Sequence, residues 1–294
     1  MAWSERQAAM LKEMGLRVDV RAAALPVIEL DNPQKSPHPV EAAAKPVAPP
    51  RPVATQAKPV PASLPVPLIP LTVARPVSTE AIATMGWPEL RSAVASCTAC
   101  KLCEGRTQTV FGVGDANAHW MVVGEAPGEQ EDAQGEPFVG KSGQLLDNML
   151  RALGLSRKGV ESSAVEANSQ VNGEVDSSKC VYIANSVKCR PPGNRNPSAD
   201  ELAQCEPYLM RQVALLQPKI ILAMGRFAVQ SLLRSAEPIG KLRGRVHDYC
   251  GVPLIVTYHP AYLLRNLEEK ARAWEDLCLA AQTYEAQVLS KPLS

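Results

Sequence analysis

Cysteines cluster at one point of the sequence and recur at two later points. Cys97 and Cys100 form a C-x-x-C pair, Cys189 lies in a proline- and glycine-rich loop, and Cys205 lies near the start of an expected helix. Thiolates three residues apart can bind one metal centre, and four thiolates complete either a zinc or an iron–sulfur site. Spacing alone leaves both open, and Cys103 is a further candidate ligand. The remaining cysteines, in apolar settings, are expected to be core residues: Cys180, Cys250 and Cys278.

A second group of polar side chains follows a short apolar run, residues 120–123. Gly124 and the pair Pro127-Gly128 end this run, and three acids follow them: Glu129, Glu131 and Asp132. After a glycine-flanked turn, leucines and a methionine recur at helical spacing. A strand, an acidic loop and a helix form an α/β unit, and ligands usually bind at the carboxyl end of such strands. The alternative is a structural turn with solvated acids.

The composition excludes few classes of function. Lys and Arg number 31 and Asp and Glu number 30, but local charge rather than the total decides whether a protein binds nucleic acid. No apolar run reaches about 18 residues, so we expect no membrane span. The N-terminus has no signal-peptide pattern. We therefore expect a cytoplasmic, bacterial protein, and in that reducing compartment clustered cysteines bind metal more often than they form disulfides.

The elements that must position these residues begin near residue 77. Residues 1–31 are expected to form a short helical segment that docks on a partner or else a frayed terminus. Residues 32–76 are rich in proline and alanine and are expected to be a disordered linker. Within residues 77–294, apolar strands at 120–123, 180–186, 219–224 and 252–258 alternate with helical patterns. This order predicts an α/β three-layer sandwich with a mostly parallel central sheet flanked by helices.

Five segments resemble, in the same order, the family 4 uracil-DNA glycosylases, the iron–sulfur branch of the uracil-DNA glycosylase superfamily. The resemblance covers residues 85–285, and the N-terminal extension and the polar loop 161–179 lie outside it. Each motif is weak alone, and the ordered set is a strong signal. The segments are 97–100 (CTAC) with 104–107 (EGRT), 124–132 (GEAPGEQED), 137–141 (PFVGK), 185–192 (NSVKCRPP) and 259–266 (HPAYLLRN).

The resemblance implies a [4Fe–4S] cluster on four cysteines, with Cys103 excluded: Cys97, Cys100, Cys189 and Cys205. It also implies hydrolysis of the N-glycosidic bond of deoxyuridine in uracil-containing DNA, which leaves an abasic site for base excision repair. We expect a monomer whose N-terminal segment binds a repair or replication protein. A non-catalytic iron–sulfur protein that binds DNA or transfers electrons is the alternative.

The matched segments predict a pocket for a flipped-out nucleotide. Phe138 offers a face for stacking on uracil, and the Asn185 carboxamide can match O4 and N3–H of uracil but not cytosine. His259 is expected to hydrogen-bond uracil O2. Asn194 is a further candidate, as is Ala126, which stands where other branches of the superfamily place Asp or Asn. The alternatives are a core phenylalanine, a turn-capping asparagine and a structural histidine.

An acid near the sugar is expected to orient or deprotonate water and to stabilise the developing cation. Glu131 is preferred over Glu125 for this role. No lysine stands out as a Schiff-base nucleophile, so a monofunctional enzyme is expected. The segment 262–264 is expected to wedge into the vacated base stack, through Tyr262 and Leu263. Basic side chains are expected to bind phosphates, or to form an ordinary solvated surface: Lys188, Arg190, Arg195 and Arg265.

Overall fold

The computed structural model describes residues 77–157 and 176–289. The expected N-terminal docking helix, the linker and most of the loop 161–179 lie outside these residues. None of the described helices is long and apolar enough to cross a membrane.

The described residues contain one six-stranded sheet in the order β1-β3-β2-β4-β6-β5. The strands are β1 (Val113–Gly114), β2 (Trp120–Gly124), β3 (Val181–Asn185), β4 (Ile220–Met224), β5 (Val246–Tyr249) and β6 (Val252–Thr257). The four inner strands pair in parallel, and β1 and β5 pair antiparallel at the two edges. Gly124 pairs with Asn185, and Met224 pairs with Thr257, so the inner strands end at one edge of the sheet.

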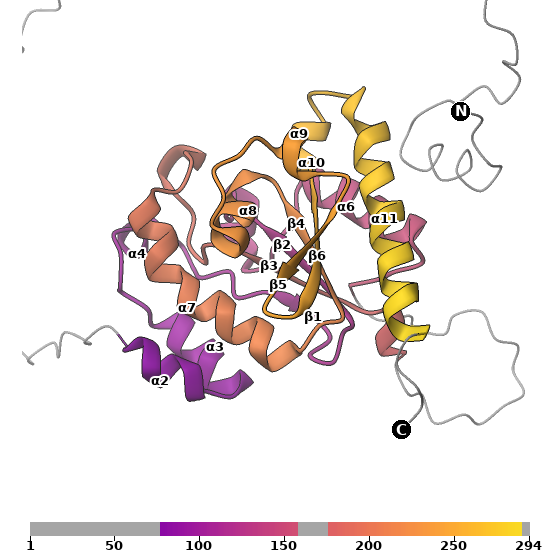
Figure 1. Ribbon diagram of the computed structural model, residues 1–294. Helices are drawn as coiled ribbons and strands as arrows, with labels where there is room; N and C mark the ends of the chain where they lie inside the picture. The colour runs from indigo at the N-terminus through magenta and orange to yellow at the C-terminus, as the bar shows by residue number, and fades with distance from the viewer. Residues whose placement is uncertain (1–76, 158–175, 290–294) are drawn as a thin grey trace, which may run out of the picture. The chain divides into compact units, whose positions relative to one another are not determined.

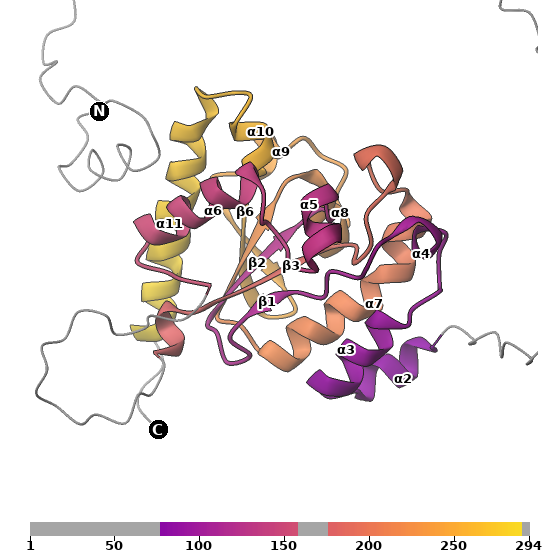
Figure 2. The same cartoon turned by 180° about the vertical axis from the view of Figure 1, so that it is seen from behind.

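Helices cover both faces of this sheet. Within the described residues they are α2 (Thr79–Thr84), α3 (Trp87–Ala95), α4 (Leu102–Gly105), α5 (Glu129–Gln134), α6 (Lys141–Ala152), η1 (Ser177–Lys179), η2 (Pro192–Asn194), α7 (Ala199–Leu216), α8 (Arg226–Leu233), α9 (Ile239–Leu242), α10 (Pro260–Leu263) and α11 (Glu269–Leu289). In both views α11 lies on one side of the sheet and α7 on the other (Figures 1 and 2).

Alternating strand residues build the two main cores. Trp120 and Val122 of β2 join the core under α6 and α11, whereas Met121 and Val123 join the core under α7 and α8. All five residues of β2 are buried, as expected for a parallel strand covered on both faces. The α/β three-layer sandwich with a mostly parallel sheet is therefore confirmed, with two antiparallel edge strands in addition.

A third, smaller core lies where α2, α3 and α4 meet α7. Leu90 and Val94 of α3 pack there with Leu202 and Tyr208 of α7, and two cysteines, Cys189 and Cys205, join the same cluster. The start of α7 is fixed by a capping box, in which Ser198 accepts from Glu201 N and the Glu201 carboxylate accepts from Ser198 N. This core brings distant cysteines to one place.

The acidic segment is a short helix rather than an open loop. α5 begins after Gly128, whose backbone N–H donates to the Glu131 carboxylate, and it ends at Gly135 in the left-handed conformation. Glycine is suited to the left-handed end because it carries no Cβ. The helix is too short for its apolar periodicity to be visible in the sequence.

Candidate active site

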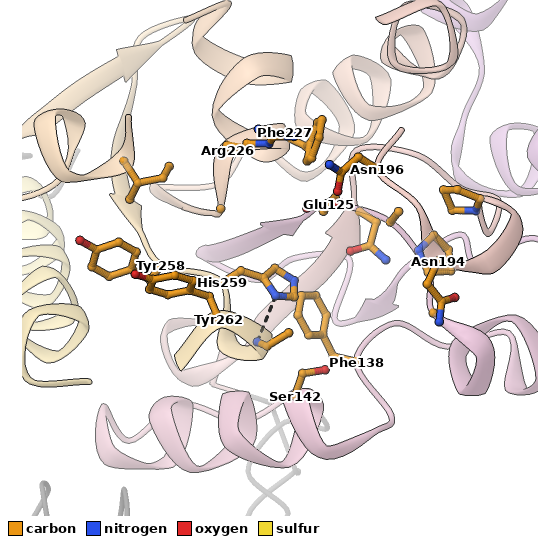
Figure 3. A pocket seen from close by; sticks show the side chains of 18 of the residues that line it. Glu125, Phe138, Ser142, Asn194, Asn196, Arg226, Phe227, Tyr258, His259 and Tyr262 are labelled. Atoms are coloured by element: carbon orange, nitrogen blue, oxygen red, sulfur yellow. Dashed lines mark hydrogen bonds between the residues drawn. The ribbon is translucent and has the colours of Figure 1, made fainter. Parts of the chain in front are cut away.

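A cavity of about 870 Å³ opens at the carboxyl ends of the inner strands. Its walls come from the segments that follow β2, β3, β4 and β6, together with Ser142 from the first turn of α6. Figure 3 shows Glu125, Phe138, His259 and Asn194 arranged around it. Segments separated by up to about half of the chain therefore converge where an open α/β sheet usually binds its ligand.

Phe138 and Asn185 meet over the end of β2. A Cβ at Gly124 would lie 2.5 Å from both the Asn185 Oδ1 atom and the Phe138 Cζ atom, so only glycine fits between them. The Phe138 ring also stacks on His259, with 5.4 Å between ring centroids and 27° between planes. The three residues predicted to bind uracil thus share one cavity, although their contacts with a substrate remain predictions.

The Asn185 side chain carries an unusual buried atom. Asn185 is 2% exposed, and its Oδ1 atom has no hydrogen-bond partner. A buried polar atom without a partner is costly, and native proteins rarely keep one without a reason. Asn185 also lines the cavity, so the unpartnered oxygen belongs to a side chain at the cavity wall.

His259 is held as a neutral hydrogen-bond donor. Its Nδ1 atom accepts a hydrogen bond from the Ala261 backbone N–H at 3.2 Å, which caps α10 (Figure 3). Burial lowers the pKa of His259 to about 4, so the ring is neutral near pH 7. With Nδ1 accepting, the neutral ring carries its hydrogen on Nε2, and that atom is left to donate.

The two candidate acids differ in how they are held. Glu131 accepts hydrogen bonds from the backbone N–H groups of Gly128 (3.1 Å), Val139 (3.0 Å) and Gly140 (3.2 Å). It therefore ties the start of α5 to the start of α6. Glu125 has no side-chain hydrogen bond or ion pair within residues 77–157 and 176–289, and burial raises its pKa while Arg226 opposes this effect. Of the two acids, Glu125 is therefore the one whose carboxylate is not engaged by the backbone, whereas the sequence led us to prefer Glu131.

Phe138 is held in a conformation that costs energy. Its φ is 56°, in the left-handed region that bulky side chains rarely adopt. Arg157 donates to the carbonyl oxygens of Pro137 (3.0 Å) and Phe138 (3.2 Å), and Asp147 accepts from Arg157 Nε at 2.8 Å. A Cβ at Gly143 would collide with the Phe138 carbonyl. Arg157 and Gly143 therefore help to fix the phenylalanine ring in the cavity.

The sequence did not predict several residues of this site, including Arg157, which holds the Phe138 backbone. No motif marks Arg157, since it follows α6 and reaches back along the chain. Arg226 and Tyr258 also line the cavity. Both could have been found, because Arg226 follows the glycine at the end of β4 and Tyr258 precedes His259 at the end of β6.

Two predicted DNA contacts are wrong because the side chains are buried. Lys188 is 1% exposed, and its Nζ atom donates to the Asn185 carbonyl at 2.8 Å and to Gln212 Oε1 at 2.6 Å. Leu263 is fully buried in the core beneath α6 and α11 and cannot wedge into DNA. Tyr262, its neighbour, is 37% exposed and lines the cavity.

The three predicted phosphate-binding arginines differ in their availability. Arg195 forms a bidentate ion pair with Glu201, in which Nη2 lies 2.6 Å from Oε1 and Nη1 lies 2.8 Å from Oε2. This ion pair lowers the pKa of Glu201 to about 2. Arg190 donates to Asn194 Oδ1 at 2.8 Å. Arg265 lines the cavity and has no side-chain partner in the described part of the chain. Arg265 is therefore the most available cation for a phosphate.

The four cysteines singled out from the sequence line a second, much smaller cavity of about 20 Å³. Cys103 lines it as well. In the described parts of the chain, no three His, Cys, Asp or Glu side chains converge closely enough to hold a single metal ion. The thiols of four cysteines therefore line a common cavity but do not meet closely at one position: Cys97, Cys100, Cys189 and Cys205.

Two donors point at the sulfur atoms of this cavity. Arg106 Nη1 donates to Cys189 Sγ at 3.0 Å, and the Lys188 backbone N–H donates to Cys205 Sγ at 3.3 Å. Burial raises the pKa of Cys205 to about 12 and also raises that of Cys189. Buried thiols become thiolates readily only when a cation compensates their charge, so this donor set fits a metal centre.

Comparison with known proteins identifies the family. A sequence profile of the uracil DNA glycosylase superfamily matches residues 111–278. The chain is 38% identical to the type-4 uracil-DNA glycosylase of Thermotoga maritima over 181 residues. These residues cover 61% of this chain and 83% of that protein. The chain is 40% identical over 182 residues to the type-4 enzyme of Saccharolobus solfataricus, covering 59% of this chain and 74% of that protein.

Two relatives from a third organism, one of type 4 and one of type 5, differ in how much of their length this chain matches. The type-4 uracil-DNA glycosylase of Pyrobaculum aerophilum is 36% identical over 203 residues, which cover 66% of this chain and 93% of that protein. The type-5 uracil-DNA glycosylase of the same organism is also 36% identical, but over 157 residues that cover 52% of this chain and 66% of that protein. The chain therefore belongs to the type-4 branch of the uracil DNA glycosylase superfamily.

Proposed function

We propose that this chain hydrolyses the N-glycosidic bond of deoxyuridine in DNA, releases uracil and leaves an abasic site for base excision repair. The observation that carries the proposal is the buried, unpartnered Asn185 Oδ1 in the cavity that Phe138 and His259 also line. A target base hidden in a duplex must be flipped into such a pocket before its glycosidic bond can be reached.

The Asn185 carboxamide reads the edge of the base. Its unpartnered oxygen accepts from N3–H of uracil, and its NH₂ group donates to O4. Cytosine presents an acceptor at N3 and a donor at C4, so both contacts would be mismatched. Because Asn185 is 2% exposed, the mismatch cannot be repaired by water and is costly.

His259 and Glu125 act on opposite charges of the breaking bond. Negative charge develops on uracil, and the neutral His259 ring donates from Nε2 to O2 of the leaving base. Positive charge develops on the sugar, and Glu125 stabilises it and orients the attacking water. Since no lysine from the described part of the chain lines the cavity, the site offers no amine for a Schiff base, which supports a monofunctional enzyme.

We infer that the four cysteines lining the small cavity hold a [4Fe–4S] cluster: Cys97, Cys100, Cys189 and Cys205. Four thiolates complete an iron–sulfur cluster as well as a zinc site, and the resemblance to the family 4 enzymes favours the cluster. When bound, the cluster supplies cross-links among three chain segments. An absorption band at about 400 nm, together with iron in the protein, would support this assignment, and a colourless zinc protein would contradict it.

One experiment tests the glycosylase proposal. Purified protein with intact cysteines is incubated with a single-stranded oligonucleotide carrying one deoxyuridine, and abasic sites are then cleaved with alkali. We expect cleavage at the deoxyuridine position after alkali and no cleavage before it. A protein that binds the oligonucleotide but releases no uracil would instead support a DNA-binding or redox role.

A further inference from the structure

The cavity extends well beyond the space that a uracil ring needs. Cavities of about 300–1,000 Å³ commonly enclose whole drug-sized ligands, whereas uracil is a single six-membered ring. At about 870 Å³, the cavity has room for more than the flipped base. Figure 3 shows Phe138 on one side of His259 and the rings of Tyr258 and Tyr262 on the other. The second side is therefore outside the uracil pocket but continuous with it.

Two tyrosines form a flat aromatic surface in this second part of the cavity. The rings of Tyr258 and Tyr262 stack with 5.1 Å between centroids and 23° between planes. Both line the cavity, and Tyr262 is 37% exposed, so part of the pair is accessible to a ligand. Pro238 and Ile239 line the same cavity and add apolar surface.

Tyr258 packs against charged side chains that restrict its ring. Burial and the nearby Glu269 carboxylate raise the pKa of Tyr258, so its hydroxyl stays protonated. The Arg243 guanidinium lies 5.9 Å from the ring centroid of Tyr258, and Arg243 is itself paired with buried Asp276 at 3.1 Å. A ring fixed in this way loses little freedom when a second ring stacks on the pair, which favours binding.

A cation stands next to the pair on the same segment. Arg265 lies one helical turn after Tyr262 and lines the cavity, and its guanidinium has no partner among residues 77–157 and 176–289. An arginine of this kind can bind a phosphate with two parallel hydrogen bonds. An aromatic face beside an available cation is the usual combination for unpaired nucleotides.

We propose that Tyr258 and Tyr262 form a stacking platform for the unpaired base next to the flipped deoxyuridine on the same strand. Arg265 binds the phosphate that joins the two nucleotides. The inference rests on the proposed function, because the cavity must first hold uracil. It also gives Tyr262 a role different from a wedge, since a platform acts on single-stranded DNA and a wedge acts only on a duplex.

The test uses the full-length protein and single-stranded oligonucleotides with one deoxyuridine. The neighbouring nucleotide on the 5′ or the 3′ side either carries its base or is a tetrahydrofuran residue that lacks one. For the unaltered protein, we expect removal of one neighbouring base to raise KM about tenfold with kcat unchanged, in line with the usual worth of base–aromatic stacking. Tyr262→Ala should show the raised KM on the normal strand and no further penalty on the base-free strand. Tyr262→Trp should behave like the unaltered protein.

Leu267→Ala is the matched control, because Leu267 is exposed on the next part of the chain but does not line the cavity. It should leave KM unchanged. The platform is refuted if neither base-free neighbour affects KM, if Tyr262→Ala keeps the full penalty, or if Tyr262→Ala impairs only duplex substrates. Failure of the proposed function would look different, since no strand would then lose uracil.

Discussion

The two cavities of this protein differ in whether their buried polar atoms have hydrogen-bond partners within the protein. In the cysteine cavity the sulfur atoms of Cys189 and Cys205 receive hydrogen bonds from Arg106 and the Lys188 backbone. In the larger cavity the Asn185 oxygen has no partner. A polar group satisfied within the protein stabilises the fold, whereas a buried group left unsatisfied beside a cavity needs an explanation, and a ligand donor is one. The contrast suggests a structural role for the first cavity and substrate recognition for the second.

One buried lysine connects the two cavities. Lys188 donates through its backbone to Cys205 and through its Nζ atom to the Asn185 carbonyl. It lies between Asn185 and Cys189 in the segment after β3. A cluster on the cysteines would therefore fix the segment that carries Asn185, the residue proposed to read the base, without taking part in the reaction.

Replacing Asn185 should have the largest effect on uracil release. We expect Asn185→Ala to lower kcat by about 100- to 1,000-fold, the usual cost of removing one preorganised polar group from an active site. The melting temperature should change little, because the lost oxygen had no partner in the free protein. Single-turnover uracil release and a thermal melt measure the two quantities. A large drop in melting temperature would show that Asn185 belongs with the structural residues.

Glu125→Gln should rank next, with kcat lowered by about 100-fold and an unchanged melting temperature. Glu131→Ala is the comparison, because it leaves three backbone N–H groups without their acceptor. It should destabilise the fold by about 1–3 kcal/mol for each N–H that stays buried and unpaired. If Glu131→Gln loses activity at full stability while Glu125→Gln stays active, the roles of the two acids must be exchanged.

The pH profile separates Glu125 from His259. Burial raises the pKa of Glu125, so its ionised fraction falls with decreasing pH earlier than that of an ordinary glutamate. His259 has a pKa of about 4 and stays neutral through this range. We expect kcat to fall on the acid side of the profile with a midpoint above 4.5, the ordinary value for a glutamate. His259→Asn should retain this acid limb in its residual activity, and an acid limb that persists in Glu125→Gln would contradict the assignment.

Arg157→Lys should have a moderate effect. Lysine keeps the charge but not the fork that donates to the carbonyls of Pro137 and Phe138. We expect kcat to fall by about tenfold as Phe138 leaves its constrained position, on the scale seen when a supporting group is lost. Arg151→Lys is the matched control, since Arg151 is exposed on α6 and, among the described residues, its side chain hydrogen-bonds to Asn148 rather than to the Phe138 segment. Equal kcat for the two variants would show that Arg157 does not position Phe138 for the reaction.

Cys103→Ser should have the smallest effect of all. Cys103 lines the cysteine cavity, but the family resemblance leaves it out of the ligand set. We expect unchanged iron content and absorption, whereas Cys189→Ser should lose most of the iron. Iron analysis of the two purified variants decides the point. Loss of iron in Cys103→Ser would make it a ligand and break the proposed set of four.

The sequence predicts the framework of this protein well, for physical reasons. Buried parallel strands such as β2 and β4 are continuous apolar runs, and the start of α7 carries a capping box that is legible as Ser198 and Glu201. The edge strands β1 and β5 were not predicted, since β1 has two residues and β5 is partly exposed. Short elements held by tertiary contacts leave little periodicity to read.

The site was predictable in its members and less so in their roles. Asn185 ends β3, His259 closely follows β6, and Phe138 lies in the segment between β2 and α6, so the parallel sheet brings them together. Lys188 was misjudged because a lysine in a basic loop is usually solvated, whereas this one is buried against Gln212. The order of Glu131 and Glu125 depends on three backbone hydrogen bonds that no sequence pattern shows.

Base release from matched oligonucleotides tests most directly whether the unpartnered amide in the large cavity reads uracil. One strand carries deoxyuridine, deoxycytidine or thymidine at a single position, and the free base is measured after a single turnover with the purified full-length protein. We predict release of uracil alone, and its loss in Asn185→Ala. Uracil release at an undiminished rate by Asn185→Ala, or equal release of cytosine by the unaltered protein, would contradict the account.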